Sequence, residues 1–252
     1  MRCVPRLRVI LLLMASSAAL GCTGRGRAAR AQTSAAVEVR RMSFLPTSQL
    51  IADPALAALV EQLAPAPRIE SAHIGYAGSP SEVHALFTRI SKAATAQQLV
   101  ALLRHDSAVV RGYAAEHVVA NFPTELAAVY PLLADSTKVE EMSGCTIGST
   151  TVSEVVLAAL QAQLERPAVQ ALLVRAAHDP QLGEVRAQAL QVVAKRRPAE
   201  ASALARGLLR ESEPQLLAAA IRTLGMTATE DCAESLCALA GAAEREVRAA
   251  VA

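Results

Sequence analysis

Five segments of this chain share a pattern that is clearest in EVRAQAL, residues 184–190. The intervals from Val185 to Leu216 and from Leu216 to Val247 are both 31 residues. Val155 lies 30 residues before Val185 but 45 after Val110, so roughly fourteen residues are inserted between the first two segments. A fixed period near thirty residues, with two helices per unit, is typical of stacked helical repeats.

Helix signals run through the chain from residue 52 onward. Asp53-Pro54 places a cap and a first-turn proline before an apolar stripe, while Ser79-Pro80-Ser81-Glu82 and Thr95-Ala96-Gln97-Gln98 both read as capping boxes. From Pro167 onward, apolar residues recur at the spacing of one helix face: Val169, Leu172, Leu173, Ala176 and Ala177.

No stretch alternates between apolar and polar residues with a period of two, so essentially no sheet is expected. The sequence therefore predicts an all-α fold over residues 52–252, a right-handed α-α superhelix of about five helix pairs.

Two of the segments, DSAVVR at residues 106–111 and EVRAQAL at 184–190, resemble HEAT-like repeats of the PBS-lyase type. In both, a turn acid is followed by Val-Arg and a small residue. The resemblance covers residues 95–252 well and 52–92 weakly, and it implies a solenoid whose second helices line a concave side. It says little about function, because the family includes scaffolds, adaptors and a few bilin lyases.

This chain departs from the family pattern at Val156 and Leu217, which stand where the family has arginine. A continuous ladder of Asp–Arg pairs is therefore not expected. Neighbouring repeats should depend more on apolar packing, in which each buried Leu or Val contributes roughly 1.5–3 kcal/mol.

The amino terminus has the layout of a bacterial lipoprotein signal in residues 1–21. Arg2, Arg6 and Arg8 precede an apolar run from Val9 to Leu20. This run is too short for a permanent membrane helix, which needs about 20 residues. The tetrad at residues 19–22 resembles a lipobox, so Cys22 is the expected lipid-attachment site; an ordinary secretory signal is the alternative. The residue after Cys22 is Thr23 and not Asp, and in this the chain resembles lipoproteins that are forwarded to the periplasmic face of the outer membrane.

Residues 22–51 are expected to form a flexible tether, because the part from 23 to 45 carries five arginines among small residues. Residues 1–21 hold three of the 25 basic residues and none of the 23 acidic ones, so the remaining chain has a formal charge of −1. A near-neutral chain with no Trp, three Tyr and three Phe gives no reason to expect nucleic-acid binding.

The sequence contains no recognisable set of catalytic residues. The five histidines are scattered, and no HExxH, CxxC, GxSxG or P-loop motif is present, so we expect neither an enzyme nor a metal or cofactor site. Three cysteines remain after Cys3 and Cys22, and a bridge from Cys145 to Cys232 or to Cys237 stays open.

Partner contacts are expected along the second helices, at positions that share one helix face. That strip is amide-rich, includes a tyrosine expected to be exposed, and suits a protein partner, although a plain solvated face is the alternative. Its predicted contact residues are Tyr113, Glu116, Gln161, Glu184, Gln188, Gln191 and Arg222.

The insertion at residues 135–151 is a second candidate contact, through Glu140, Glu141 and Cys145. The alternatives are a partner contact and a tolerated surface loop. Met142, Cys145 and Ile147 favour a loop that folds back on the body.

The sequence thus predicts a non-enzymatic protein-interaction scaffold, anchored to the membrane of the bacterial envelope by its lipid; a lyase-like or ligand-carrying protein is the alternative. Residue 252 follows Val247 closely, with no polar cap over the last repeat. A truncated product or self-association through this end is therefore expected.

Overall fold

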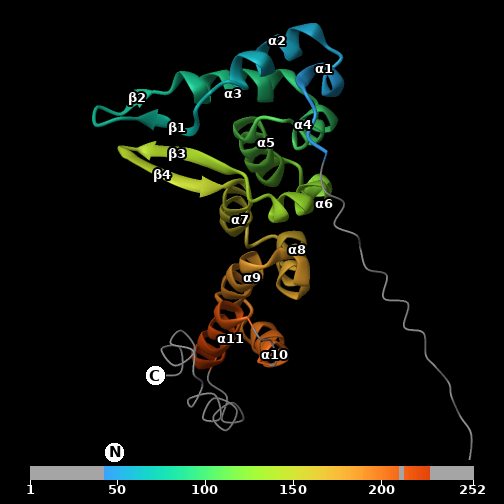
Figure 1. Ribbon diagram of the computed structural model, residues 1–252, viewed down its shortest axis with the longest axis vertical. Coiled ribbons are helices and arrows are strands. Elements are labelled where there is room, and N and C mark those ends of the chain that lie inside the picture. The colour runs from blue at the N-terminus through green and yellow to red at the C-terminus, as the bar shows by residue number, and fades with distance from the viewer. Residues whose placement is uncertain (1–42, 210–212, 228–252) are drawn as a thin grey trace, which may run out of the picture. The chain divides into compact units, whose positions relative to one another are not determined.

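The computed structural model describes residues 43–209 and 213–227, and all of them fall within one compact unit of the chain. Helices predominate, but a four-stranded mixed sheet extends from one side of them (Figure 1). The prediction of an all-α superhelix is therefore wrong, because the fold combines helices with a sheet.

The described elements follow one another in a mixed order, with helical turns of the tighter 3-10 type labelled η. In chain order they are α1 (Thr47–Leu50), α2 (Pro54–Leu63), β1 (Arg68–Ile74), β2 (Ser79–Pro80), α3 (Glu82–Ala93), α4 (Ala96–Leu102), α5 (Ala108–Asn121), η1 (Pro123–Glu125), α6 (Leu126–Val129), η2 (Tyr130–Ala134), β3 (Lys138–Gly144), β4 (Thr146–Thr151), α7 (Val152–Ala162), α8 (Pro167–His178), η3 (Pro180–Leu182), α9 (Glu184–Ala194), α10 (Pro198–Leu208) and α11 (Pro214–Thr227).

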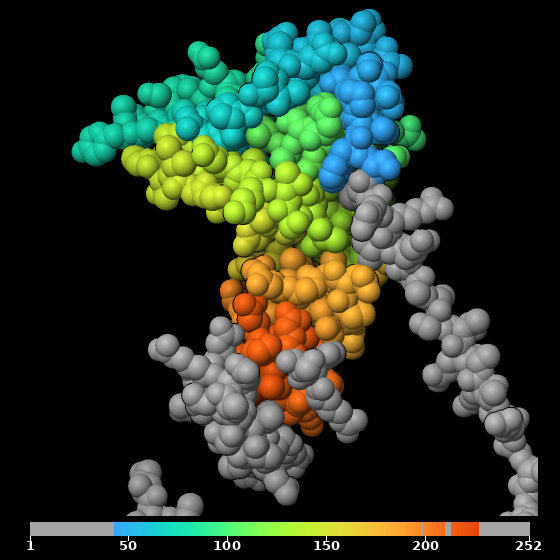
Figure 2. Space-filling view, in the orientation of Figure 1, coloured from blue at the N-terminus to red at the C-terminus, as the bar shows by residue number. Residues whose placement is uncertain are grey.

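The sheet has the strand order β2-β1-β3-β4 and is made of two antiparallel hairpins joined by a parallel pair. In the parallel pair, Arg68 of β1 lies opposite Glu140 of β3. The space-filling view shows the surfaces of the two hairpins in direct contact (Figure 2). The insertion predicted as a loop is thus the β3–β4 hairpin.

The β3–β4 hairpin turns through Gly144 and Cys145, since Ser143 pairs with Thr146 on either side. Gly144 has a φ of 56°, a left-handed conformation that glycine adopts without steric cost. Cys145 is exposed, and the side chain of Ile147 is 55% exposed. Of the three apolar residues expected to fold back on the body, Met142 is half-buried on β3, which pairs with β1, whereas Cys145 and Ile147 stay exposed near the turn.

The strands could not be predicted from the sequence because their apolar and polar residues do not alternate. Ile69 and Glu70 are neighbours on β1, yet both are buried. The Glu70 carboxylate accepts hydrogen bonds from Arg68 Nε at 2.8 Å and Ser81 Oγ at 2.7 Å. On β3 and β4, Val139 is the only hydrophobic residue in the core, so strand pairing and polar contacts replace the usual period-two pattern.

The local helix signals have mostly been confirmed. Asp53 Oδ1 accepts hydrogen bonds from the first turn of α2, Thr95 and Gln98 form a capping box at α4, and α8 begins at Pro167. The five apolar residues predicted for α8 are its buried residues. The capping box predicted at Ser79 is wrong: Ser79 and Pro80 form β2, and Ser81 caps α3 by accepting from the His84 backbone N–H.

Consecutive helices pack in pairs, α4 with α5, α8 with α9 and α10 with α11. The second helices also pack on one another in chain order, α5 with α7, α7 with α9 and α9 with α11. Arg111 of α5, 1% exposed, donates from Nε to Asp135 Oδ2 at 2.8 Å and so ties α5 to the segment before β3.

Residues at the end of the range assigned to the tether pack on this body. Leu45 donates its backbone N–H to Arg104 O and accepts from Asp106 N, and Ile51 is buried in the core. Thr47 is buried beside His105, with Oγ1 at 2.9 Å from Nε2. The signal residues 1–21, Cys22 and most of the expected tether lie outside the described residues.

Candidate binding sites

A cleft of about 390 Å³ lies between the sheet and helices α3 and α5. We call it the sheet cleft. It brings together Tyr113 and Glu116 from α5 with Glu141 from β3, which sequence analysis had assigned to two separate surfaces. The cleft is lined by Ile69, Glu70, Ser71, Ala72, His84, Phe87, Tyr113, Glu116, His117, Ala120, Asn121 and Glu141.

Tyr113 forms a wall of the sheet cleft and is not the exposed residue that the sequence had indicated. It is 2% exposed, and its hydroxyl donates to the Glu70 backbone carbonyl at 2.7 Å. The same oxygen accepts from the Glu70 backbone N–H, also at 2.7 Å. The tyrosine therefore satisfies two buried backbone groups of β1 and fixes the strand against α5.

Aromatic rings from α3 and α5 gather around Tyr113. The Phe87 ring stacks on Tyr113 with a centroid distance of 4.8 Å and an interplanar angle of 13°. His84 meets Tyr113 edge-on at 6.4 Å, and His117 meets Phe87 edge-on at 5.9 Å. These contacts give the cleft a rigid aromatic side, because each ring is held by at least one other.

Glu116 and Glu141 form the acidic side of the sheet cleft. Burial and the nearby Glu141 carboxylate raise the pKa of Glu116 to about 7. Burial also lowers the pKa of His117, which favours its neutral form. Within the described part of the chain, the side chains of His84, Glu116, His117 and Glu141 make no hydrogen bond or ion pair. Four polar side chains that line the cleft are thus without a hydrogen-bond partner among the described residues.

A glycine on α5 lies where the helix meets the sheet. A Cβ on Gly112 would lie 2.4 Å from Cδ1 of Ile69, so with any other residue here the end of the Ile69 side chain would have to move. Tyr113 and Glu116 follow Gly112 on the same helix and also lie beside the sheet.

A second recess, of about 290 Å³, lies at the amino-terminal ends of α7 and α9, and we call it the α7–α9 groove. Glu154, Glu184 and Gln188 line it. Glu154 also closes the capping box of α7, where it accepts from the Thr151 backbone N–H at 2.8 Å; this hydrogen bond, the largest effect, lowers the pKa of Glu154 although burial opposes it. The groove therefore has an ionised carboxylate at its rim.

The other residues predicted for partner contact lie on the same successive helices. Gln161 on α7 and Arg222 on α11 are exposed, and Gln191 on α9 is half-buried. None of these three lines the sheet cleft or the α7–α9 groove. The predicted strip is thus divided: its first two residues belong to the sheet cleft, and the rest follow α7, α9 and α11.

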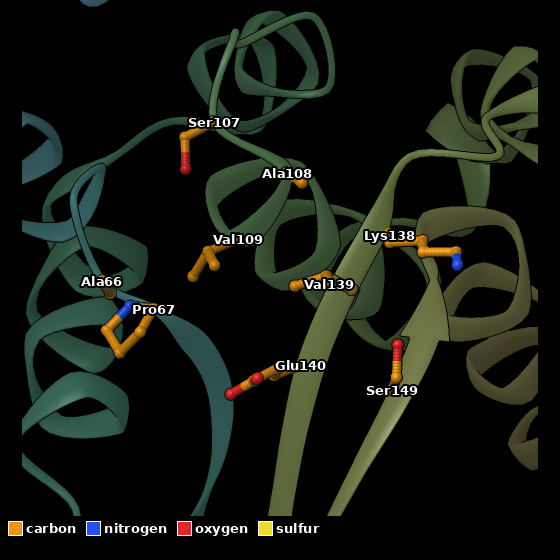
Figure 3. A pocket seen from close by; sticks show the side chains of 9 residues that line it. All are labelled: Ala66, Pro67, Ser107, Ala108, Val109, Lys138, Val139, Glu140 and Ser149. Carbon is orange, nitrogen blue, oxygen red and sulfur yellow. The ribbon is translucent and has the colours of Figure 1, made fainter.

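A third recess, of about 490 Å³, lies at the start of β3, and we call it the outer groove (Figure 3). Val109 of α5 and Val139 of β3 approach each other there, while Glu140 and Lys138 point in different directions. Glu140 and Glu141 are neighbours on β3 and project to opposite sides of the sheet. The outer groove carries one acid and one base, so it has no net charge to select a ligand.

Cys145 lies apart from all three recesses, at the tip of the β3–β4 hairpin, where it is a free and exposed thiol. Its considered partners Cys232 and Cys237 lie outside the described residues, as does the chain end from Val247 to Ala252 where self-association was expected.

Phe87 was not among the predicted site residues, Ser81 was expected only in a helix cap, and His84 and His117 were expected only as scattered histidines. The signal for the missing sheet was weak but present. Thr146-Ile147-Gly148-Ser149-Thr150-Thr151 is rich in β-branched residues and follows a Gly-Cys turn, a combination typical of a hairpin.

Comparisons of the chain with protein-family models, curated proteins and solved structures find no match. In the described ranges, no three His, Cys, Asp or Glu side chains are grouped to hold a metal ion.

Proposed function

We propose that this protein is a non-enzymatic binding module that holds a partner protein along α7, α9 and α11. The observation that supports this proposal is a line of exposed or half-buried polar side chains that continues across these three packed helices and includes residues of the α7–α9 groove. We call this surface the polar strip; its members are Glu154, Gln161, Glu184, Gln188, Gln191, Gln215 and Arg222.

The chemistry of the polar strip favours a protein partner. Its amides both donate and accept hydrogen bonds, and its charged groups include acids on α7 and α9 and a base on α11. A surface that carries both positive and negative charges suits a protein partner in a non-obligate interface better than it suits a polyanion. The resemblance of the helix pairs to HEAT-like repeats, which include adaptors, is in keeping with this role.

We further propose that the module acts in the bacterial cell envelope, attached through a lipid on Cys22 to the periplasmic face of the outer membrane. The signal-like residues 1–21 support this location. Among the helices that the structure describes, none combines the length and hydrophobicity needed to cross a membrane. Replacing Cys22 with alanine should abolish metabolic labelling with palmitate and release the protein from the membrane fraction.

The binding role is tested by crosslinking and affinity purification of the full chain from its native envelope. The variant Glu184→Ala/Gln188→Ala/Arg222→Ala should lose the proteins that the wild type retains. The matched control His178→Ala/Arg206→Ala changes exposed residues of the first helices α8 and α10 and should retain them. Equal recovery by the triple variant and the wild type would remove the polar strip from consideration.

A further inference from the structure

The sheet cleft is acidic and lies apart from the polar strip. Glu116 and Glu141 face it, and no lysine or arginine is among the residues that line it. Glu70 also lines it, but the carboxylate of Glu70 is already bonded to Arg68 and Ser81. The charge of the cleft therefore comes from the two carboxyl groups that have no partner among the described residues.

The aromatic side of the cleft complements these acids. Phe87 and Tyr113 line it as a stacked pair, and the Tyr113 hydroxyl is held by both backbone groups of Glu70. Aromatic faces attract cations through their quadrupole, and they also pack against the methylene groups of an alkyl chain. A ligand with an apolar stem and a positive end would satisfy both sides of the cleft.

The histidines add acceptors for such a ligand. His84 and His117 line the cleft, and their rings make no hydrogen bond with the described residues. A neutral imidazole has one nitrogen that accepts a hydrogen bond. An ammonium group carries three N–H donors, so two carboxylates and an imidazole nitrogen match its bonding capacity.

We propose that the sheet cleft binds an organic ammonium group between Glu116 and Glu141, with the rings of Phe87 and Tyr113 as the apolar wall for its alkyl stem. The ammonium group comes from a lysine side chain of a bound protein or from a free alkylamine. The volume of about 390 Å³ accommodates either, since ligand pockets typically span about 300–1,000 Å³. This site is distinct from the polar strip and does not depend on it.

Binding should be linked to proton release. A bound ammonium favours the ionised form of Glu116, which is about half protonated near pH 7 in the free protein. The amine should therefore expel up to roughly half a proton per site at pH 7. The titratable groups lining the cleft around Glu116 are Tyr113 and His117 on α5, His84 on α3, Glu70 on β1 and Glu141 on β3.

The test is calorimetric titration of the full chain, at low ionic strength, with two amines and one neutral analogue. Butylamine represents a free amine, N-acetyl-lysine methylamide represents a protein side chain, and N-acetyl-norleucine methylamide lacks the charge. We expect saturable binding of at least one amine and none of the neutral analogue. Binding of butylamine alone identifies a free amine as the ligand, whereas binding of the lysine derivative identifies a protein side chain.

Conservative variants locate the site. Glu141→Gln and Glu116→Gln should each weaken amine binding about tenfold, the worth of one charge-assisted hydrogen bond. Glu140→Gln is the matched control, because Glu140 is the neighbour of Glu141 on β3 but projects to the other side of the sheet. Since Glu141 is exposed, its replacement should leave folding unchanged.

The proposal is overturned by no saturable binding of either amine, by equal binding of the neutral analogue, or by an equal loss in Glu140→Gln. A magnesium or calcium ion that displaces the amine with greater affinity would also overturn it, since the site would then select a metal ion.

Discussion

The hydroxyl of Tyr113 makes the hydrogen bonds with the Glu70 backbone that a neighbouring strand would otherwise make. It meets the backbone N–H and carbonyl of Glu70, both at 2.7 Å, in a part of β1 where Glu70 is 5% exposed. One side chain thus completes the hydrogen bonding of a strand that β2 is too short to cover.

Removing that hydroxyl should weaken the fold. Tyr113→Phe leaves two buried backbone groups without a partner, which we expect to lower the free energy of unfolding by about 1–3 kcal/mol. Urea denaturation followed by circular dichroism measures the change. Tyr76→Phe is the control, since Tyr76 is fully exposed at 101%, and equal stability of the two variants would contradict the assigned role.

Glu116 should make stability depend on pH. Its pKa rises from 4.5 to about 7 in the folded protein, so between these values the folded state binds more protons than the unfolded state. Stability must then fall as pH increases through this window, by up to about 3 kcal/mol, and level off above it. Urea midpoints measured from pH 4.5 to 8 should show the decline in the wild type and a smaller one in Glu116→Gln; parallel curves would argue against burial of this carboxyl.

At the scale of elements, α5 and β1 meet where the Ile69 side chain packs on the helix at Gly112. Ile69 is 3% exposed and lies over Gly112, and Val155 of α7 is the next neighbour. The Ile69 side chain therefore occupies the space that a side chain at position 112 would need.

Gly112→Ala tests this fit. Alanine favours a helix by about 1 kcal/mol over glycine, but the new methyl group overlaps Ile69, and overpacking costs about 1–3 kcal/mol. We expect net destabilisation in urea, and we expect Ile69→Val to restore stability in that variant although it destabilises the wild type by about 1 kcal/mol.

Gly225→Ala in α11 is the control for helix propensity. A Cβ at Gly225 would meet nothing within 4 Å, so this change should leave stability unchanged or raise it. If Ile69→Val had the same effect with and without Gly112→Ala, the two residues would not be coupled.

At the scale of the whole molecule, the sheet is built into the helical body. The β3–β4 hairpin runs directly into α7 through the Thr151 capping box, and the backbone N–H of Val152 donates to Thr137 O. Arg111 holds Asp135, just before β3, through a buried ion pair. The hairpin is thus tied at both of its ends.

Replacing residues 139–150 with a short Gly-Ser linker should therefore destabilise the body. The change removes Val139 from the core, exposes Ile69 and leaves β1 without its parallel partner. Each buried apolar side chain contributes about 1.5–3 kcal/mol, so we expect a loss above ~3 kcal/mol in urea unfolding. Ile147→Thr, which changes an exposed residue of the same hairpin, is the control. If the linker variant were as stable as the wild type, the β3–β4 hairpin would not contribute to the stability of the helical body.

Features that depend on near neighbours in the chain could be predicted from the sequence. The Asp53 and Thr95 caps and the apolar face of α8 were all readable, because caps and helix faces involve residues only a few positions apart. The thirty-residue recurrence likewise pointed to helix pairs that pack in order.

The sheet and the cleft beside it depend on contacts between residues far apart in the chain, so they are seen only in the folded structure. Arg68 and Glu140 meet across a long separation in sequence, and the strands bury only Ile69 and Val139 as apolar core residues. Their stability comes from hydrogen bonds to each other and to Tyr113 and Ser81, and such contacts leave no periodic pattern. Glu116 and Glu141 share a cleft only because that pairing places β3 against α5.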